Sequence, residues 1–204
     1  MPSEVDWYEA YHPESIRLDN WDYRRSAWYF LTICTADRRP YFGTIQDGIM
    51  GLSQAGCVAA QEWRRTPAVR PYVRLDAWIV MPNHVHGILG LTTESPGHDA
   101  AESNSPKSME EPDVETSRRD VSTQGNAQES KDESRLRAHS VGAIVGQYKS
   151  ICTKRIRAAC RPDFGGQSRY YDRILRYRDE VKTARRYILQ NPATWAEDRH
   201  FPPA

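Results

Sequence analysis

The stretch YVRLDAWIVMPNHVHGILGL, residues 72–91, decides the fold because it reads as two strands joined by a short turn. Apolar and polar residues alternate over 72–81, and a period of two predicts a strand. Pro82 and Asn83 predict a tight turn, since both residue types favour turn conformations. Residues 84–91 are then expected to run back as the second strand of a hairpin.

Working outward, the flanking patterns add two strands and three helices. The predicted elements are a strand over 26–37, a helix over 52–66 capped by Ser53, a helix over 140–160, a strand or extended segment over 168–177, and a helix over 178–191 capped by Asp179 and stopped by Pro192. The order β, α, β, β, α, β predicts an α+β fold, a ferredoxin-like split βαβ antiparallel sheet with helices on one face. The last helix is extra and C-terminal.

The composition divides the chain unevenly. Residues 94–138 lack aromatic side chains and are rich in Ser, Glu, Asp, Pro and Gln, so we predict a disordered insertion there. Between residues 92 and 139 there are 11 acidic and 6 basic residues, a net charge of −5, which leaves +6 for the rest of the chain. We therefore expect an N-terminal extension over 1–22 and a single basic domain over 23–199, interrupted by the insertion. A basic domain hints at a polyanionic partner, although a basic helix face is also often merely solvated.

Composition also excludes some classes of protein. No apolar run approaches the roughly 20 residues of a membrane helix, and the N-terminus lacks the basic start and apolar run of a signal peptide, so a cytoplasmic protein without a membrane partner is expected. The four cysteines form no CxxC pair and are expected to be small buried hydrophobic residues.

The hairpin carries an unusual pair, His84 and His86, within an apolar strand. Side chains two residues apart project from the same face of a strand, so both imidazoles can reach one metal ion, while Val85, Leu89 and Leu91 pack against helices on the other face. A bare His-x-His also fits two structural histidines bonded to neighbouring carbonyls. The pair alone leaves both interpretations open.

The predicted C-terminal helix adds a second pair. Tyr187 and Asn191 are four residues apart and share a helix face, with Tyr187 at the edge of the apolar stripe made by Val181, Ala184 and Ile188. Taken alone, such a tyrosine is an ordinary core-edge aromatic with its hydroxyl in water.

Four motifs together resemble a known family. WYFLTICTADRRPYFG near the start, AWIVMPNHVHGIL in the middle, VGQYKS on a helix and YILQNP near the end are similar to the single-tyrosine HUH transposases, and most of all to the REP-associated tyrosine transposases. The resemblance covers residues 23–92 and 140–195 and leaves the acidic insertion outside.

The resemblance implies a function and a site. It implies a metal-dependent endonuclease and strand transferase that cuts single-stranded DNA at hairpin or repeat sequences through a 5′-phosphotyrosine. Tyr187 would be the nucleophile, and His84, His86 and Asn191 would hold a divalent metal, Mg²⁺ or Mn²⁺. Tyr170 and Tyr171 also precede a basic stretch, but the family places its nucleophile on the terminal helix. The resemblance favours a monomer associated with the nucleoid when bound to DNA, and leaves a homodimer open.

Basic side chains are candidates for phosphate contacts, with Trp28 or Tyr148 as stacking surfaces for bases. The candidates are Arg38, Arg39, Lys149, Lys154, Arg155, Arg185 and Arg186, with Arg157 on the same helix as Lys154.

Two alternatives remain. A domesticated relative would bind structured DNA without cutting it, although all four catalytic positions are retained. A zinc hydrolase built on the histidine pair would need further ligands, and the other histidines, His12, His98, His139 and His200, lie in the termini or the insertion.

Overall fold

The computed structural model describes residues 21–92, 138–198 and 200. All but the last residue of the predicted insertion and nearly all of the predicted N-terminal extension lie outside the described residues. The domain bounds of 23–199 therefore stay a prediction.

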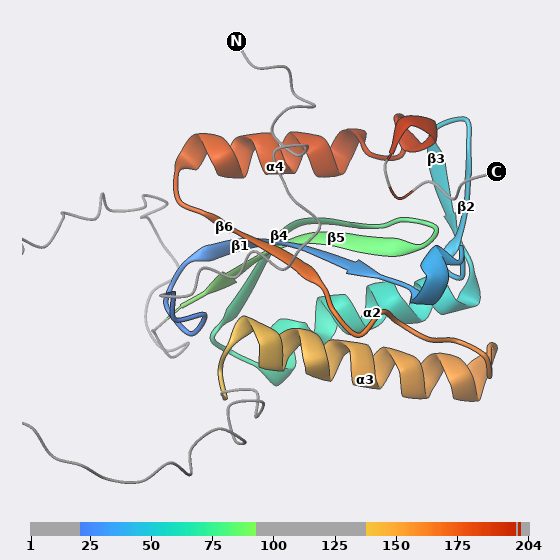
Figure 1. The fold of residues 1–204 in the computed structure, drawn as a ribbon, viewed down its shortest axis with the longest axis horizontal. Coiled ribbons are helices and arrows are strands. Elements are labelled where there is room, and N and C mark those ends of the chain that lie inside the picture. Colours follow the sequence, from blue (N-terminus) through green and yellow to red (C-terminus); the bar gives the residue numbers. More distant parts are fainter. Residues whose placement is uncertain (1–20, 93–137, 199, 201–204) are drawn as a thin grey trace, which may run out of the picture.

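A four-stranded antiparallel sheet forms the centre of the molecule (Figure 1). Its strands are β4 (Val73–Val80), β5 (His84–Leu91), β1 (Trp28–Cys34) and β6 (Tyr171–Leu175), in that spatial order. This is the strand order of a ferredoxin-like split βαβ unit, in which the first strand lies inside the sheet between the third and the fourth. The predicted fold class is confirmed.

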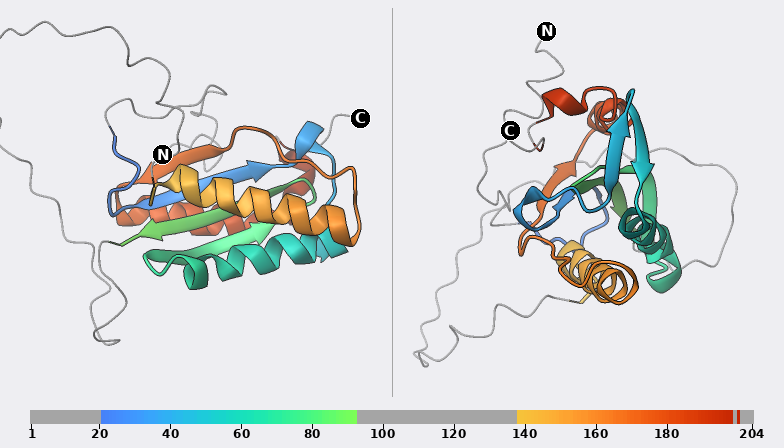
Figure 2. Two further views of the ribbon diagram at one scale, coloured as in Figure 1. Left: turned by 90° about the horizontal axis from the view of Figure 1, so that it is seen from below. Right: turned by 90° about the vertical axis from the view of Figure 1, so that its right-hand side faces the viewer.

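Helices cover both faces of this sheet (Figure 2). The helices α2 (Gln54–Val69) and α3 (Val141–Ala159) lie together on one face, and α4 (Arg178–Gln190) lies alone on the other. The alternation along β1 explains the arrangement, since Tyr29, Leu31 and Ile33 belong to the core under α2 and α3, whereas Phe30 belongs to the smaller core under α4. The sequence-predicted division of β5 is confirmed in the same way, because Val85, Leu89 and Leu91 join the larger core.

Close packing of α2 on β5 depends on a glycine. A Cβ atom added to Gly87, between His86 and Ile88, would lie 2.4 Å from Cζ2 of Trp63. The Trp63 ring thus packs directly on the strand backbone behind the histidine pair and is 1% exposed.

A second hairpin was not predicted. The strands β2 (Gly43–Gln46) and β3 (Ile49–Leu52) pair as a separate two-stranded sheet between β1 and α2. Its turn residues Asp47 and Gly48 have φ values of 51° and 73°, and an Asp-Gly pair between short strands is a strong hairpin signal. The strands are only four residues long and mostly exposed, so their hydrophobic pattern is weak.

The strand β4 departs from simple alternation. Its register against β5 shifts between Leu75 and Trp78, so Leu75 and Trp78 pack with the larger core while Ala77 and Ile79 pack under α4. A bulge of this kind inserts an extra residue and changes the face on which the following side chains lie.

The predicted helices are present with small differences at their ends. Ser53 caps α2 as predicted, its hydroxyl accepting from the Gly56 N–H at 3.1 Å. At α4 the prediction was wrong, because Tyr177 rather than Asp179 stands at the N-cap position, and the Glu180 carboxylate accepts from the backbone N–H of Arg176. Two further short 3-10 turns are η1 (Ala36–Arg38) and η2 (Trp195–Glu197).

Two compositional expectations can be checked. Cys34 and Cys152 are buried as expected, and burial raises the pKa of the Cys152 thiol to about 12, but Cys57 is exposed and Cys160 is half-buried. Within the described parts of the chain, none of the helices combines the length and the apolar character needed to span a bilayer.

Candidate active site

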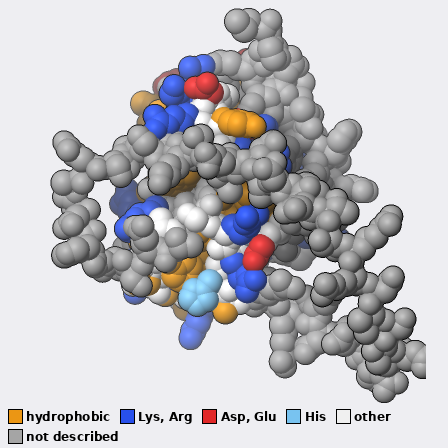
Figure 3. Space-filling model, turned by 90° about the vertical axis from the view of Figure 1, so that its left-hand side faces the viewer, with side chains coloured by type: hydrophobic (Ala, Val, Ile, Leu, Met, Phe, Trp, Pro, Cys, Tyr) orange, Lys and Arg blue, Asp and Glu red, His pale blue; other side chains and the backbone are white. Residues whose placement is uncertain are grey.

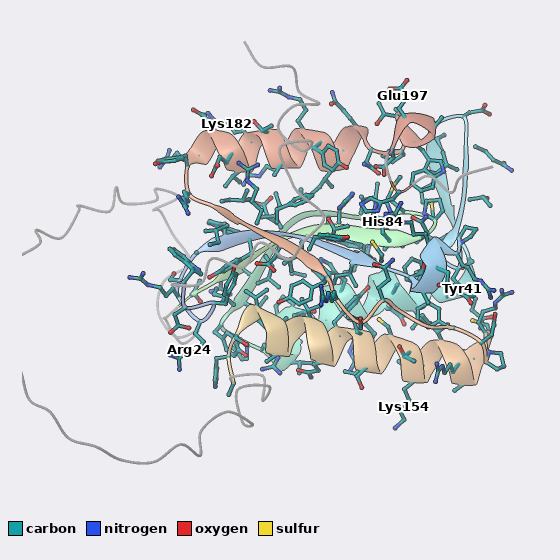
Figure 4. All side chains as sticks on the ribbon, viewed as in Figure 1. Arg24, Tyr41, His84, Lys154, Lys182 and Glu197 are labelled. Carbon is teal, nitrogen blue, oxygen red and sulfur yellow. The ribbon has the colours of Figure 1, made fainter. Side chains whose placement is uncertain are left out.

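The two histidines lie on β5 under α4 and are both fully buried. Figure 4 places His84 in the layer between the sheet and α4, below the turn that carries Glu197. The two ring centroids are 4.3 Å apart. The prediction that both imidazoles project from one face of the strand is confirmed.

Hydrogen bonds at Nδ1 set the orientation of each ring. His84 Nδ1 lies 2.8 Å from Asn83 Oδ1, and His86 Nδ1 lies 2.9 Å from Thr32 Oγ1. The Asn83 amide is itself oriented, because its Nδ2 donates to the carbonyl oxygens of Arg38 at 3.0 Å and His200 at 2.6 Å. The partner of His84 is thus an acceptor oxygen, which fits a ring that donates from Nδ1 and leaves Nε2 available to a metal ion. Histidine ligands of metals are commonly held in this way.

The nucleophile predicted on α4 does reach the histidine pair. The Tyr187 hydroxyl lies 3.4 Å from His86 Nε2, although 101 residues separate the two in sequence. The Tyr187 ring packs edge-on against His86 and Phe30, with centroid distances of 5.2 and 5.9 Å. Tyr187 is half-buried, so it is neither a solvated edge residue nor a closed core residue.

Asn191, directly after the last turn of α4, is 1% exposed. Its Nδ2 donates to Asp198 Oδ2 at 2.8 Å. Its Oδ1 is buried and has no hydrogen-bond partner among the described residues. A buried acceptor left in this way costs about 1–3 kcal/mol. A cation ligated by that oxygen would remove the cost, so the orphaned atom fits the predicted metal site.

The structure adds Asp198, which sequence reasoning missed. Ligand atoms of His84, His86 and Asp198 all lie within 4.8 Å of one another. Imidazole nitrogens together with carboxylate and carboxamide oxygens fit a divalent cation such as Mn²⁺, while oxygen ligands suit Mg²⁺. The donors present therefore fit a divalent metal without selecting one.

The prediction that His200 lies away from the histidine pair, in the terminus, was wrong. It is 1% exposed, and its ring centroid is 4.6 Å from that of His84. Its Nδ1 lies 3.8 Å from Cys34 Sγ, and its backbone N–H donates to Asp198 Oδ1 at 2.6 Å. The chain after α4 turns back over the histidine end of the sheet, and no local periodicity in the sequence signals such a return.

One set of predicted DNA-binding residues lies around the site. Arg38 and Arg39 belong to the turn after β1, whose Arg38 carbonyl holds Asn83. Arg185 and Arg186 immediately precede Tyr187 on α4 and are exposed.

Arg185 is engaged with the sheet. Its guanidinium makes hydrogen bonds of 2.6–3.1 Å to both carboxylate oxygens of Asp76 on β4. Partial burial by itself raises the pKa of Asp76, but the hydrogen bonds from Arg185 and from the Ala77 N–H, together with the Arg185 charge, lower it below its ordinary value. This ion pair therefore ties α4 to the edge strand beside the nucleophile.

A second set lies on α3, across the sheet from the site. Figure 4 shows Lys154 on the outer side of α3, far from the layer that holds His84. Arg155 is paired with Glu62 of α2. Lys149 donates to the backbone carbonyls of Gln167 and Ser168, and burial lowers the pKa of its ammonium group. Their assignment to DNA binding stays a prediction, but they and the nucleophile lie on opposite faces of the sheet.

The two aromatic residues predicted to stack on bases lie in different places, Tyr148 in the larger core and Trp28 under α4. Tyr148 is buried, its hydroxyl donates to the Ala59 carbonyl, and burial raises its pKa well above the ordinary value, so it offers no surface on which a base could stack. Trp28 lies under α4, where its ring covers Gly90. Tyr171, the alternative tyrosine on β6, pairs with Thr32 and so lies on the same face of the sheet as His86. The predicted nucleophile Tyr187 differs from it in contacting His86 directly.

Basic side chains occur beyond the site as well. Figure 3 views the end of the molecule at which α4 begins and shows Lys and Arg side chains in several separate places among hydrophobic ones. Positive charge is therefore spread over this surface and does not by itself mark one binding face.

No protein-family model matches the chain. An uncharacterized protein of Haemophilus influenzae is 29% identical over 191 residues, which cover 94% of each chain. A solved structure of a REP-associated tyrosine transposase bound to a REP hairpin has a TM-score of 0.46 and 16% sequence identity, covering 88% of this chain and 76% of that one.

Proposed function

We propose that this chain is a metal-dependent single-stranded DNA endonuclease and strand transferase of the REP-associated tyrosine transposase type. The observation that carries the proposal is the 3.4 Å approach of the Tyr187 hydroxyl to His86 Nε2. Asn191, whose buried Oδ1 has no partner among the described residues, is linked to the same hydroxyl through Asp198 Oδ2. Two of the four motifs that resemble this family supply these residues, AWIVMPNHVHGIL for the histidines and YILQNP for Tyr187 and Asn191, and the two motifs are distant in the chain.

The proposed reaction is a transesterification. The Tyr187 oxygen attacks the scissile phosphorus, the bond from phosphorus to the 3′ oxygen breaks, and that oxygen leaves as a 3′-hydroxyl once protonated. The phosphodiester energy is kept in the 5′-phosphotyrosine, so a 3′-hydroxyl of another strand can reverse the step. No external energy source is required.

The phenol must be made nucleophilic. A free phenol with a pKa near 10 is only about a thousandth ionised at pH 7, a deficit of about 4 kcal/mol. A divalent ion held by His84, His86 and Asn191 would supply charge stabilisation at the phosphate.

The protein supplies the positioning. The phenol ring packs edge-on against the stacked rings of His86 and Phe30. The Asp76–Arg185 ion pair ties α4 to the sheet. Arg38, Arg39 and Arg186 are proposed to contact phosphates of the substrate, because they lie at the histidine end of the sheet or beside the nucleophile. We propose hairpin or repeat DNA as the substrate, on the family resemblance alone.

The test is covalent capture. The full-length protein is incubated with labelled single-stranded repeat DNA and Mn²⁺, and SDS-resistant adducts are counted. Wild type and Tyr171→Phe should form the adduct, while Tyr187→Phe should lose it by about 10⁴-fold or more, as nucleophile deletions do. An adduct that survives Tyr187→Phe would eliminate the proposed nucleophile.

The same assay separates the alternatives. A domesticated, non-cutting protein would bind the repeat DNA but form no adduct in the wild type. One observation favours the zinc hydrolase: Asp198 completes a possible ligand set of two histidines and a carboxylate. It would release cleaved product without an adduct, and Tyr187→Phe would leave its rate unchanged.

A further inference from the structure

The segment after α4 brings a carboxylate to the centre of the site. Asp198 follows the short turn η2, and its two oxygens have different partners. Oδ1 accepts from the His200 N–H at 2.6 Å, which fixes the carboxylate to the backbone. Oδ2 accepts from Asn191 Nδ2 at 2.8 Å and lies 3.4 Å from the Tyr187 hydroxyl. One oxygen thus touches both the predicted nucleophile and a predicted metal ligand.

The contact with Asn191 decides which way its amide faces. Because Nδ2 is held by Asp198, Oδ1 must occupy the other position of the planar amide group. That oxygen is the buried, unsatisfied atom. Asp198 therefore sets Asn191 in the orientation in which its oxygen can serve a cation.

Asp198 is also within reach of the histidines. Its ligand atom and those of His84 and His86 lie within 4.8 Å of one another, and two oxygen or nitrogen ligands bound at about 2.1 Å to one ion lie roughly 3 Å apart. A shift of the carboxylate or the rings by about 1 Å each closes the difference.

We propose that Asp198 is a direct metal ligand in this protein and supplies more of the metal affinity than Asn191 does. The inference deepens the proposed function and rests on it only in placing the metal at the histidine pair. Two imidazoles and a carboxamide are neutral, whereas the carboxylate brings a full negative charge. Asp198 is half-buried, and the attraction of a divalent cation for a full charge exceeds its attraction for an amide dipole at the same distance.

The test measures metal binding without DNA. Mn²⁺ is titrated into the full-length protein, and free Mn²⁺ is followed by its electron paramagnetic resonance signal. Asp198→Asn, which keeps the shape and removes the charge, should weaken Mn²⁺ binding at least about tenfold, and Asn191→Ala should weaken it less. Glu197→Gln is the matched control, since it removes an exposed carboxylate one residue away and should leave the affinity unchanged.

Infrared difference spectra supply a second measurement, and its main readout, the wild-type spectrum, does not depend on how well any variant folds. Mn²⁺ should shift a carboxylate stretching band of the wild-type protein, and Asp198→Glu, which keeps the charge, should retain a shifted band. Equal Mn²⁺ affinity in wild type and Asp198→Asn, or a wild-type spectrum without a carboxylate shift, would overturn the inference. Because neither readout uses DNA, a missing adduct in wild type counts against the proposed function alone.

Discussion

The two faces of the sheet are built differently. The face under α2 and α3 holds the larger core, with side chains such as Tyr29, Leu31 and Trp63 fully or almost fully buried. The face under α4 has a small apolar cluster of Phe30, Ile88, Leu175, Ala184 and Ile188. Two helices thus seal one face, while a single helix leaves the far half of the other to polar groups.

Those polar groups are buried, and two pairs of them are in direct contact, Thr32 with His86 and Asn83 with His84. Thr32, Asn83, His84, His86 and Asn191 are all 0–1% exposed and lie at the end of the sheet that the chain after α4 covers. Burying polar groups is costly unless each finds a partner, so such a network is retained for chemistry more readily than for stability. The comparison teaches that one face carries the stability and the other carries the site.

Among the perturbations that distinguish the two faces, metal removal should have the largest effect, and it should act on the α4 face alone. Chelation by EDTA is expected to lower adduct formation about a thousandfold, because the ion's charge stabilisation is worth several kcal/mol. Adduct yield before and after addition of Mn²⁺ measures this.

Hydrogen exchange sharpens the same prediction. Mn²⁺ should slow exchange at β5 and α4 and leave the amides of α2 and α3 unchanged. Equal protection on both faces would break the proposed division between them.

One substitution on the α2–α3 face should lower the free energy of unfolding of the protein. Trp63→Ala should lower the free energy of unfolding by about 3–5 kcal/mol, since it removes a large ring packed directly on Gly87. Urea denaturation measures the change. Leu189→Ala, at a position 74% exposed on α4, serves as the control and should change stability by less than about 0.5 kcal/mol.

The smallest effect is expected at the tether of α4. Asp76→Asn should cost about 0.5–1 kcal/mol, because the Asp76–Arg185 pair is partly exposed and screened by solvent. Since the folded-state pKa of Asp76 is lowered, its contribution is complete above the unfolded value near 4 and is lost as the pH falls through the folded value.

Thermal unfolding at several pH values measures the tether. The difference between wild type and Asp76→Asn should be constant at neutral pH and shrink in acid. A difference that grows on acidification would have the wrong sign for a depressed carboxyl pKa and would exclude this ion pair as the cause.

Much of the fold was predictable because it depends on short-range pattern. The alternation in β5 placed His84 and His86 on one face, and helical spacing placed Tyr187 and Asn191 on one side of α4. The hairpin β2–β3 was not predicted despite its Asp47-Gly48 turn, since its strands are too short and too exposed to show a hydrophobic period. The bulge in β4 was not predicted, because it depends on the pairing of β4 with β5 and not on the residues of β4 alone.

The sequence by itself determined the elements of the central sheet and its helices, their order and the faces of the four predicted site residues, since periodicity records which side of each element must be buried. Only the tertiary structure decided that Asp198 and His200 return to the histidine pair, and that Lys149, Lys154 and Arg155 lie across the sheet from it. Such contacts depend on where a chain goes after its last helix and on which layer covers which face. These are properties of packing between distant segments, and no local pattern encodes them.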